Sequence, residues 1–198
     1  MPYQVVAISE EIARQVRTSL RSPKYGHPAH IEVANGYGPC RSCLQTFVEG
    51  QDERILFTYD SFTGVGGLPS PGPVFIHREE CKRFEAAGFP PKLRPLPLVL
   101  EGYGCGSWRL LQEPVVNDDV DMVIERLFAF PAVEYIQVRN AEAGCFMALI
   151  ERALMNRGKE KSPGGVGTTG ALVVSGANSN GRYNNRPVCC GGNTRYRS

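Results

Sequence analysis

The chain has 198 residues, 42% of them hydrophobic and 21% charged, which is the size and composition of one globular domain with an apolar core. No apolar run approaches the roughly 18 residues that span a bilayer, and the N-terminus lacks the pattern of a secretory signal. We therefore expect no membrane segment and a cytoplasmic location. From Arg157 onward seven Lys or Arg residues accompany one acid, so this tail carries +6 while residues 1–156 carry −4. A mildly acidic body argues against binding to a nucleic-acid backbone.

The first half of the chain predicts one amphipathic helix followed by short strands. Apolar residues recur at every fourth position from Ile8 to Leu20 and Ser9 can cap, so we expect a helix over residues 9–21. Residues 22–39 are rich in Pro and Gly and predict a looped or extended approach. We then expect a hairpin of residues 44–48 and 54–59, a Gly/Pro loop over 61–72, a strand over 73–76 and a helix over 78–87.

The second half predicts a strand-rich region whose core ends near Met155. We expect strands over residues 96–103 and 107–111, a helix over 119–128 capped by Asp118, and a final hairpin of strands 133–139 and 145–152. After Gly158 the composition changes to Gly, Ser, Thr and Asn. We therefore expect one α+β domain over residues 1–156, with a small antiparallel sheet and few helices, and a disordered tail over 157–198.

Two short clusters of metal-binding residue types, separated by 33 residues, carry the clearest chemical signal. Cys40 and Cys43 have the C-x-x-C spacing of a zinc knuckle, and His77 and Cys81 lie four residues apart after the expected strand. A knuckle, a hairpin and a helix in this order resemble a treble clef. The positive N-terminal end of the expected helix would stabilise the thiolate form of a cysteine there. The sequence predicts a structural zinc site formed by these four residues.

These four residues also have interpretations other than metal binding. The cysteines can be small buried hydrophobes, His77 a hydrogen-bonded core residue, and Cys40 and Cys43 a transient disulfide. The familiar helix spacing has two intervening residues where His77 and Cys81 have three, so His27 or His30 is an alternative ligand, although loop histidines are more often plain polar residues.

The remaining cysteines give weaker signals. Cys145 alternates with apolar residues like a core strand position, and Cys105 lies in a glycine-flanked turn as a candidate exposed thiol with no base nearby in the sequence. The adjacent pair Cys189 and Cys190 lies in the tail and is poor support for a metal site. The chain carries no P-loop, dinucleotide fingerprint, nucleophile elbow or H-E-x-x-H motif.

Three separated motifs together resemble a mostly bacterial family, the domain of unknown function number 1203. They are residues 38–44 around the first cysteine pair, residues 72–77 with Cys81, and Val138-Arg139-Asn140 followed by Gly144-Cys145-Phe146. The resemblance covers roughly residues 27–151 and implies a compact α+β domain with no established activity. It also implies that Arg139 and Cys145 are motif positions, which makes them candidates for a catalytic role.

Three functions compete on this basis. The first is a cytosolic zinc-stabilised domain that acts in binding or regulation, with a protein partner or a homodimer left open. The second is an enzyme of unknown substrate. It uses Cys145 or Cys105 as a nucleophile, with Arg139 binding an anion, or it uses an open position on the zinc. The third is a protein-interaction or nucleic-acid module that uses the basic tail.

Overall fold

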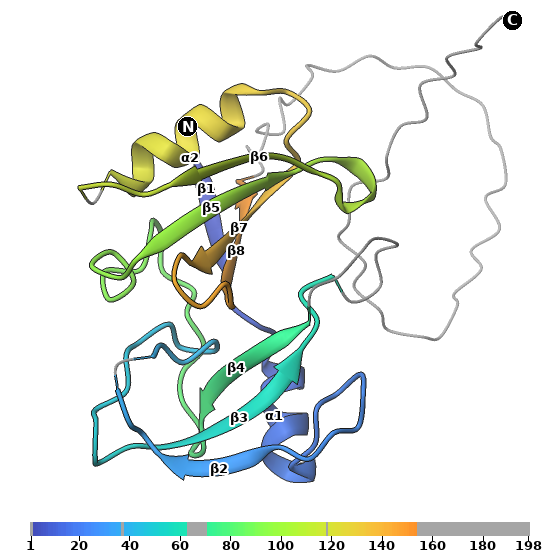
Figure 1. Ribbon diagram of the computed structural model, residues 1–198, viewed down its shortest axis with the longest axis vertical. Helices are drawn as coiled ribbons and strands as arrows, with labels where there is room; N and C mark the ends of the chain where they lie inside the picture. Colours follow the sequence, from blue (N-terminus) through green and yellow to red (C-terminus); the bar gives the residue numbers. More distant parts are fainter. Residues whose placement is uncertain (1, 37, 63–70, 118, 154–198) are drawn as a thin grey trace, which may run out of the picture. The chain divides into compact units, whose positions relative to one another are not determined.

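The computed structural model describes residues 2–36, 38–62, 71–117 and 119–153 (Figure 1). The chain divides into two units, Met1–Leu154 and Met155–Ser198, and the expected disordered tail lies outside the described residues. The elements of the first unit are β1 (Tyr3–Val6), α1 (Glu10–Ser19), β2 (His30–Val33), β3 (Glu53–Tyr59), β4 (Gly72–His77), β5 (Leu98–Tyr103), η1 (Cys105–Ser107), β6 (Arg109–Pro114), α2 (Val120–Ala129), β7 (Tyr135–Asn140) and β8 (Phe146–Arg152). Neither α-helix is long and apolar enough to cross a membrane.

Five strands form the larger, fully antiparallel sheet in the order β1-β8-β7-β5-β6. The apolar side of α2 packs on one face of this sheet (Figure 1) and contributes Val123, Ile124 and Leu127 to a core with Leu100 of β5 and Ile136 of β7. These side chains are essentially inaccessible to solvent, and burial of each stabilises the fold by roughly 1.5–3 kcal/mol. This sheet and its helix form the first core.

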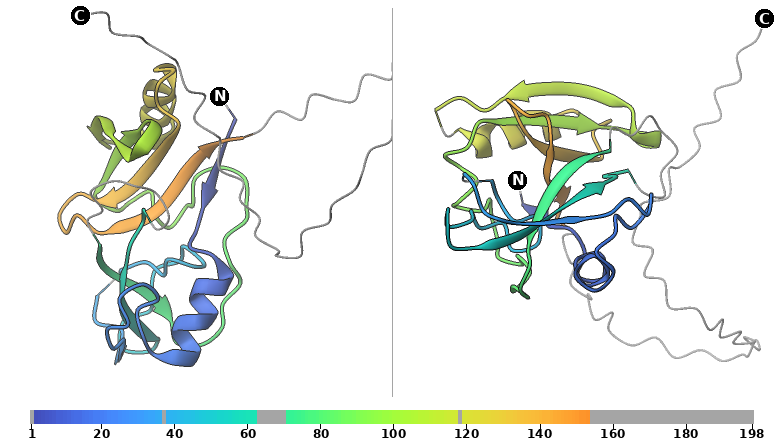
Figure 2. Two further views of the ribbon diagram at one scale, coloured as in Figure 1. Left: turned by 90° about the vertical axis from the view of Figure 1, so that its right-hand side faces the viewer. Right: turned by 60° about the horizontal axis from the view of Figure 1, so that its bottom comes forward.

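Three strands form the smaller antiparallel sheet in the order β2-β3-β4 (Figure 2). Helix α1 begins where Ser9 Oγ accepts a hydrogen bond from the Ile12 amide, and it ends at Leu20 in the left-handed region. Its buried face, Ala13 and Val16, packs with apolar side chains of β3 and β4 into a second core.

Each core includes a large buried side chain from the other part of the fold. Leu44, which follows the cysteine knuckle, is fully buried in the first core, whereas Phe146 at the start of β8 belongs to the second core and lies 5.3 Å from the Tyr59 ring. Residues 78–97, which we call the strap, connect β4 to β5 without regular secondary structure and place Phe89 and Leu93 in the first core. The knuckle, Phe146 and the strap therefore hold the two sheets together.

Most predicted elements are confirmed. The helices at 9–21 and 119–128 are α1 and α2, the expected strands at 73–76, 96–103 and 107–111 are β4, β5 and β6, and the C-terminal hairpin is β7 with β8. Helix α2 has Asp119 at its N-cap position, and Asp118 lies outside the described residues. The α+β class is confirmed by two α-helices and two antiparallel sheets.

Two predictions are wrong. Residues 44–48 do not pair with β3 as a hairpin. They form only an isolated bridge, Pro39 with Thr46, and β3 pairs instead with β2, which lies inside the segment expected to be looped or extended. The predicted helix over 78–87 is absent, so the third element of a treble clef is missing after β4. There the backbone bonds to the knuckle, where the Phe84 amide donates to the Ser42 carbonyl, and tertiary pairing replaces the helical ladder.

Replacing Phe146 by Ala should lower the free energy of unfolding by about 3–5 kcal/mol, because it removes a buried ring from the contact between the sheets. Urea unfolding followed by circular dichroism measures this. The matched control is Phe130→Ala, since that ring is 52% exposed and its loss should change stability by no more than about 0.5 kcal/mol. Equal effects of the two substitutions would contradict this role of Phe146.

Candidate metal centre

The fold brings Cys40, Cys43, His77 and Cys81 together, with their ligand atoms all within 4.8 Å of one another. Cys40 and Cys43 flank a tight turn in which the Cys40 amide donates to the Gln45 carbonyl and the Leu44 amide donates to the Cys40 carbonyl. His77 is the last residue of β4, and Cys81 lies four residues further along the strap. These four residues, the Cys3His cluster, could hold a metal ion.

The turn that aligns the two knuckle sulfurs includes a strained residue. Leu44 has φ +57°, in the left-handed region that a β-carbon disfavours by about 1–3 kcal/mol. Two hydrogen bonds close the turn around it, and its side chain is fully buried. Burial of Leu44 in the first core therefore offsets the strain that bends the backbone back and brings both sulfurs to one side.

Polar groups surround the cluster on several sides. The His77 amide lies 3.4 Å from Cys40 Sγ as a donor, and Asp52 Oδ2 lies 3.6 Å from His77 Nε2, the ring nitrogen that does not face the sulfurs. Arg17 of α1 donates from Nη2 to Cys81 Sγ at 3.4 Å and from Nε to the His77 carbonyl at 3.1 Å. Such outer contacts orient ligands and compensate the negative charge of thiolates.

The crowded sulfurs change one another's protonation. Hydrogen bonding from Cys43, and then from Cys81, lowers the pKa of Cys40, whereas the bond to Cys40 raises the pKa of Cys43. Hydrogen bonds to Cys40 and Cys81 raise the pKa of His77 to about 10. The cluster thus concentrates negative charge at buried sulfur, and this environment favours a bound cation.

The knuckle residue Arg41 is fully buried directly beside the ligand Cys40. Its guanidinium donates to the Phe146 carbonyl at 2.6 Å, to Cys145 Sγ at 3.1 Å and to the Pro39 carbonyl. Burial lowers the pKa of Arg41, and the neighbouring sulfurs of Cys145 and Cys40 oppose that shift. Arg41 therefore joins the knuckle to strand β8 of the larger sheet.

The two candidate catalytic residues lie close in sequence but have different partners. Arg139 is buried: its guanidinium lies 2.8 Å from Glu101 Oε2 and donates to Gln137 Oε1 and to the Gly144 carbonyl. The Arg139 Nε–H is not aligned for a hydrogen bond, so its contact with Glu101 is an ion pair. Cys145, next to Gly144, is half-buried and accepts from Arg41. Arg139 thus has protein partners at the positions that an anion would occupy.

The alternative ligands lie elsewhere. His27 is exposed and stacks on Tyr25 at 5.6 Å, and His30 is exposed at the start of β2; neither belongs to the Cys3His cluster. Cys105 is exposed in η1.

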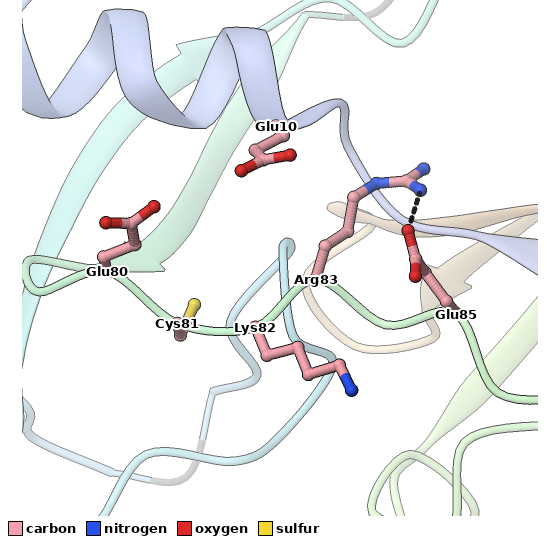
Figure 3. Close-up of a pocket in the computed structure, with 6 residues that line it drawn as sticks. All are labelled: Glu10, Glu80, Cys81, Lys82, Arg83 and Glu85. Atoms are coloured by element: carbon pink, nitrogen blue, oxygen red, sulfur yellow. Dashed lines mark ion pairs between the residues drawn. The ribbon is translucent and has the colours of Figure 1, made fainter.

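Two pockets open beside the half-buried ligands. A pocket of about 260 Å³ reaches Cys81 and is otherwise lined by charged side chains of α1 and the strap (Figure 3), and a second pocket of about 160 Å³ includes His77 and Asp52. Cys40 and Cys43 line neither of these two pockets. The cluster therefore has a buried knuckle side and a side that small molecules can approach.

The outer residues Arg17, Arg41 and Asp52 were missed by the sequence reasoning. Arg17 has the position of a helix-end cation, Arg41 is one of the two positions that the C-x-x-C pattern leaves unspecified, and Asp52 belongs to a turn. Nothing local distinguishes them, because each acts on residues brought close by the fold.

Comparison with known protein families gives a match over more than half of the chain. The family model described as "Protein of unknown function (DUF1203)" matches residues 37–152, which include all four residues of the Cys3His cluster as well as Arg139 and Cys145. No curated protein and no solved structure matches the chain.

Replacing Arg41 by Lys should lower the free energy of unfolding by at least about 2 kcal/mol, because a single ammonium cannot reach all three acceptors and an unpaired buried acceptor costs about 1–3 kcal/mol. Arg78→Lys is the control, since Arg78 forms an exposed ion pair with Glu53 and its change should cost well under about 1 kcal/mol. Urea unfolding of both variants measures the difference, and a stable Arg41→Lys protein would disprove the importance of the guanidinium.

Proposed function

Because this chain belongs to the DUF1203 family, whose members are of unknown function, we propose that Cys40, Cys43, His77 and Cys81 bind a structural zinc ion. The domain so stabilised acts in binding or regulation in the cytosol. The arrangement of the four donor atoms carries the proposal.

Two of the separations between donor atoms match tetrahedral zinc, and all four donor atoms lie within 4.8 Å of one another. With Zn–S near 2.3 Å and Zn–N near 2.05 Å, a tetrahedron places two sulfurs about 3.8 Å apart and a sulfur and nitrogen about 3.5 Å apart. Cys40 Sγ and Cys81 Sγ are 3.8 Å apart, and Cys43 Sγ and His77 Nδ1 are 3.5 Å apart. Disulfide sulfurs would be about 2.05 Å apart, so the 3.8 Å between Cys40 and Cys81 supports two ligands of one ion over a disulfide.

The chemistry of the donors favours zinc as well. Three thiolates and one imidazole are soft and borderline donors, which bind zinc in preference to magnesium or calcium. His77 would coordinate through Nδ1 while Nε2 faces Asp52, the carboxylate–histidine arrangement common around zinc. Four protein ligands complete the tetrahedron and leave no position for a reactive water, which supports a structural role.

A metal here would anchor the strap. Cys81 is the strap's only residue in the Cys3His cluster. Two residues later, the Arg83 guanidinium donates to the Ala7 and Ile8 carbonyls. The strap then continues into the first core. Structural zinc contributes on the order of 10 kcal/mol in small finger peptides. The ion would therefore join the knuckle, the end of β4 and the strap.

Exposed apolar side chains support the proposal that the domain acts in binding or regulation. Trp108, the chain's only tryptophan, is 73% exposed next to β6, where Leu110 is exposed too. Exposed aromatic and aliphatic side chains are frequent at protein interfaces, so a protein partner or a homodimer is the expected ligand class.

The purified chain should contain one zinc per molecule by elemental analysis, and a strong chelator should lower the melting temperature by about 10 °C or more. Cys43→Ser should lose zinc and stability together, because an alcohol is a poor replacement for a thiolate. His27→Ala and His30→Ala serve as controls and should keep the full zinc content. A metal-free protein with an unchanged, cooperative melting transition would refute the proposal.

A cysteine-dependent enzyme is the second candidate, and the contact between Arg41 and Cys145 supports it. A guanidinium 3.1 Å from a half-buried sulfur is the environment in which reactive thiols occur. In a zinc-dependent version, one half-buried ligand, His77 or Cys81, would give way to water.

If Cys145 is a nucleophile, iodoacetamide should alkylate it in the folded protein at least about tenfold faster than in urea, because only the folded chain places Arg41 beside the sulfur. Mass spectrometry of the peptides measures the rates, and Cys145→Ser should remove the signal while the melting temperature stays within a few degrees. Slower alkylation in the folded state would contradict a nucleophilic role and indicate that Cys145 only packs in the fold.

A further inference from the structure

We propose that Cys81 is an oxidation site at which a small neutral peroxide releases the zinc ion by forming a Cys40–Cys81 disulfide. This inference rests on the proposed zinc site and adds a regulatory input to it. Three features of the described residues support it: access to one sulfur, the position of a second sulfur, and the backbone that carries each.

Access favours Cys81 over the other thiols of the cluster. Cys40 and Cys43 are buried, whereas Cys81 is half-buried and lines the pocket of about 260 Å³. Figure 3 shows its sulfur directed toward the space between Glu10 and the strap. A reagent in this pocket therefore meets Cys81 first.

The charges that line the pocket select the reagent. Glu10, Glu80 and Glu85 accompany Lys82 and Arg83, and Arg83 is engaged with the Ala7 and Ile8 carbonyls. Three carboxylates against two cations give the lining a net negative charge, so a neutral oxidant such as hydrogen peroxide fits the pocket better than an anionic one. Arg17 donates to the Cys81 sulfur and would orient it as a thiolate.

A second sulfur lies ready to complete the reaction. Cys40 Sγ is 3.8 Å from Cys81 Sγ, so an approach of less than about 2 Å forms the S–S bond. Cys40 lies in a hydrogen-bonded turn, whereas Cys81 lies in the strap, which has no regular secondary structure to break. The strap can therefore supply the movement.

The electron balance needs one peroxide. The Cys81 thiolate attacks one peroxide oxygen, the S–O bond forms as the O–O bond breaks, and hydroxide leaves to take a proton and become water. The Cys40 thiolate then attacks the Cys81 sulfur, so the S–S bond forms, the S–O bond breaks and a second hydroxide leaves as water. Two thiolates are oxidised by two electrons in total and one peroxide is reduced. Zinc keeps only Cys43 and His77 and is released as Zn²⁺.

The test uses the zinc-loaded full chain with hydrogen peroxide. A chromogenic chelator should report release of one zinc per chain, and peptide mapping should find the Cys40–Cys81 disulfide appearing at the same rate. Dimedone added at early times should label Cys81 before any other cysteine, and dithiothreitol with zinc should restore the starting state.

Two matched variants separate the thiols. Cys81→His keeps four zinc ligands but removes the attacked sulfur, so release should slow at least tenfold. Cys43→His also keeps four ligands and retains Cys40 and Cys81, so it should release zinc at nearly the wild-type rate. If a variant fails to bind zinc, the dimedone and disulfide maps of the wild-type chain decide alone.

The outcomes distinguish this inference from the zinc proposal. A chain that contains no zinc before peroxide is added overturns both. Zinc that is present but is retained in peroxide, or is released with a Cys40–Cys43 disulfide or with first labelling at Cys43 or Cys145, overturns the oxidation site and leaves the zinc site standing.

Discussion

The charge of Arg41 is the constraint on which the rest of the structure depends. A guanidinium keeps its proton under all ordinary conditions, so its complete burial is tolerable only where acceptors surround it. Here two carbonyls and the Cys145 sulfur accept from it, and they belong to the knuckle and to the hairpin of β7 and β8. Pairing the Arg41 guanidinium with these acceptors brings together segments that are more than a hundred residues apart in the sequence. The turn that contains Arg41 also aligns the sulfurs of Cys40 and Cys43.

Main-chain bonds at the knuckle extend the connection. The Arg41 amide donates to the Phe75 carbonyl of β4 and its carbonyl accepts from the Ile8 amide, so one residue contacts both sheets and the start of α1. His77 lies two residues beyond Phe75, which is why β4 delivers it to the knuckle. A metal would add Cys81 and the strap to this junction. Arginine and metal thus have complementary roles, since the first contributes positive charge beside the buried knuckle and the second would balance the three thiolates of the cluster.

The elements that sequence reasoning predicted well are those whose signals are local. The four-residue apolar spacing and Ser9 specify α1, and the alternation in residues 133–152 specifies the hairpin of β7 and β8. The failures have non-local causes. Strand β2 is stabilised by pairing with β3, and residues 78–87 have a helical composition but bond to the knuckle and to the carbonyls before α1. Tertiary hydrogen bonds outweighed intrinsic propensity at both places.

By itself the sequence determined the α+β class, the family resemblance and the four residues of the candidate metal centre, because C-x-x-C and a spaced His/Cys pair restrict chemistry through residue type alone. Only the tertiary structure decided that His77 and Cys81 meet the knuckle without a helix, that Arg139 is paired with Glu101, and that Arg41 is the partner of Cys145. The physical reason is that ligand type is a property of single residues. Burial, charge pairing and access to a sulfur are properties of neighbours that the chain brings together only when it folds.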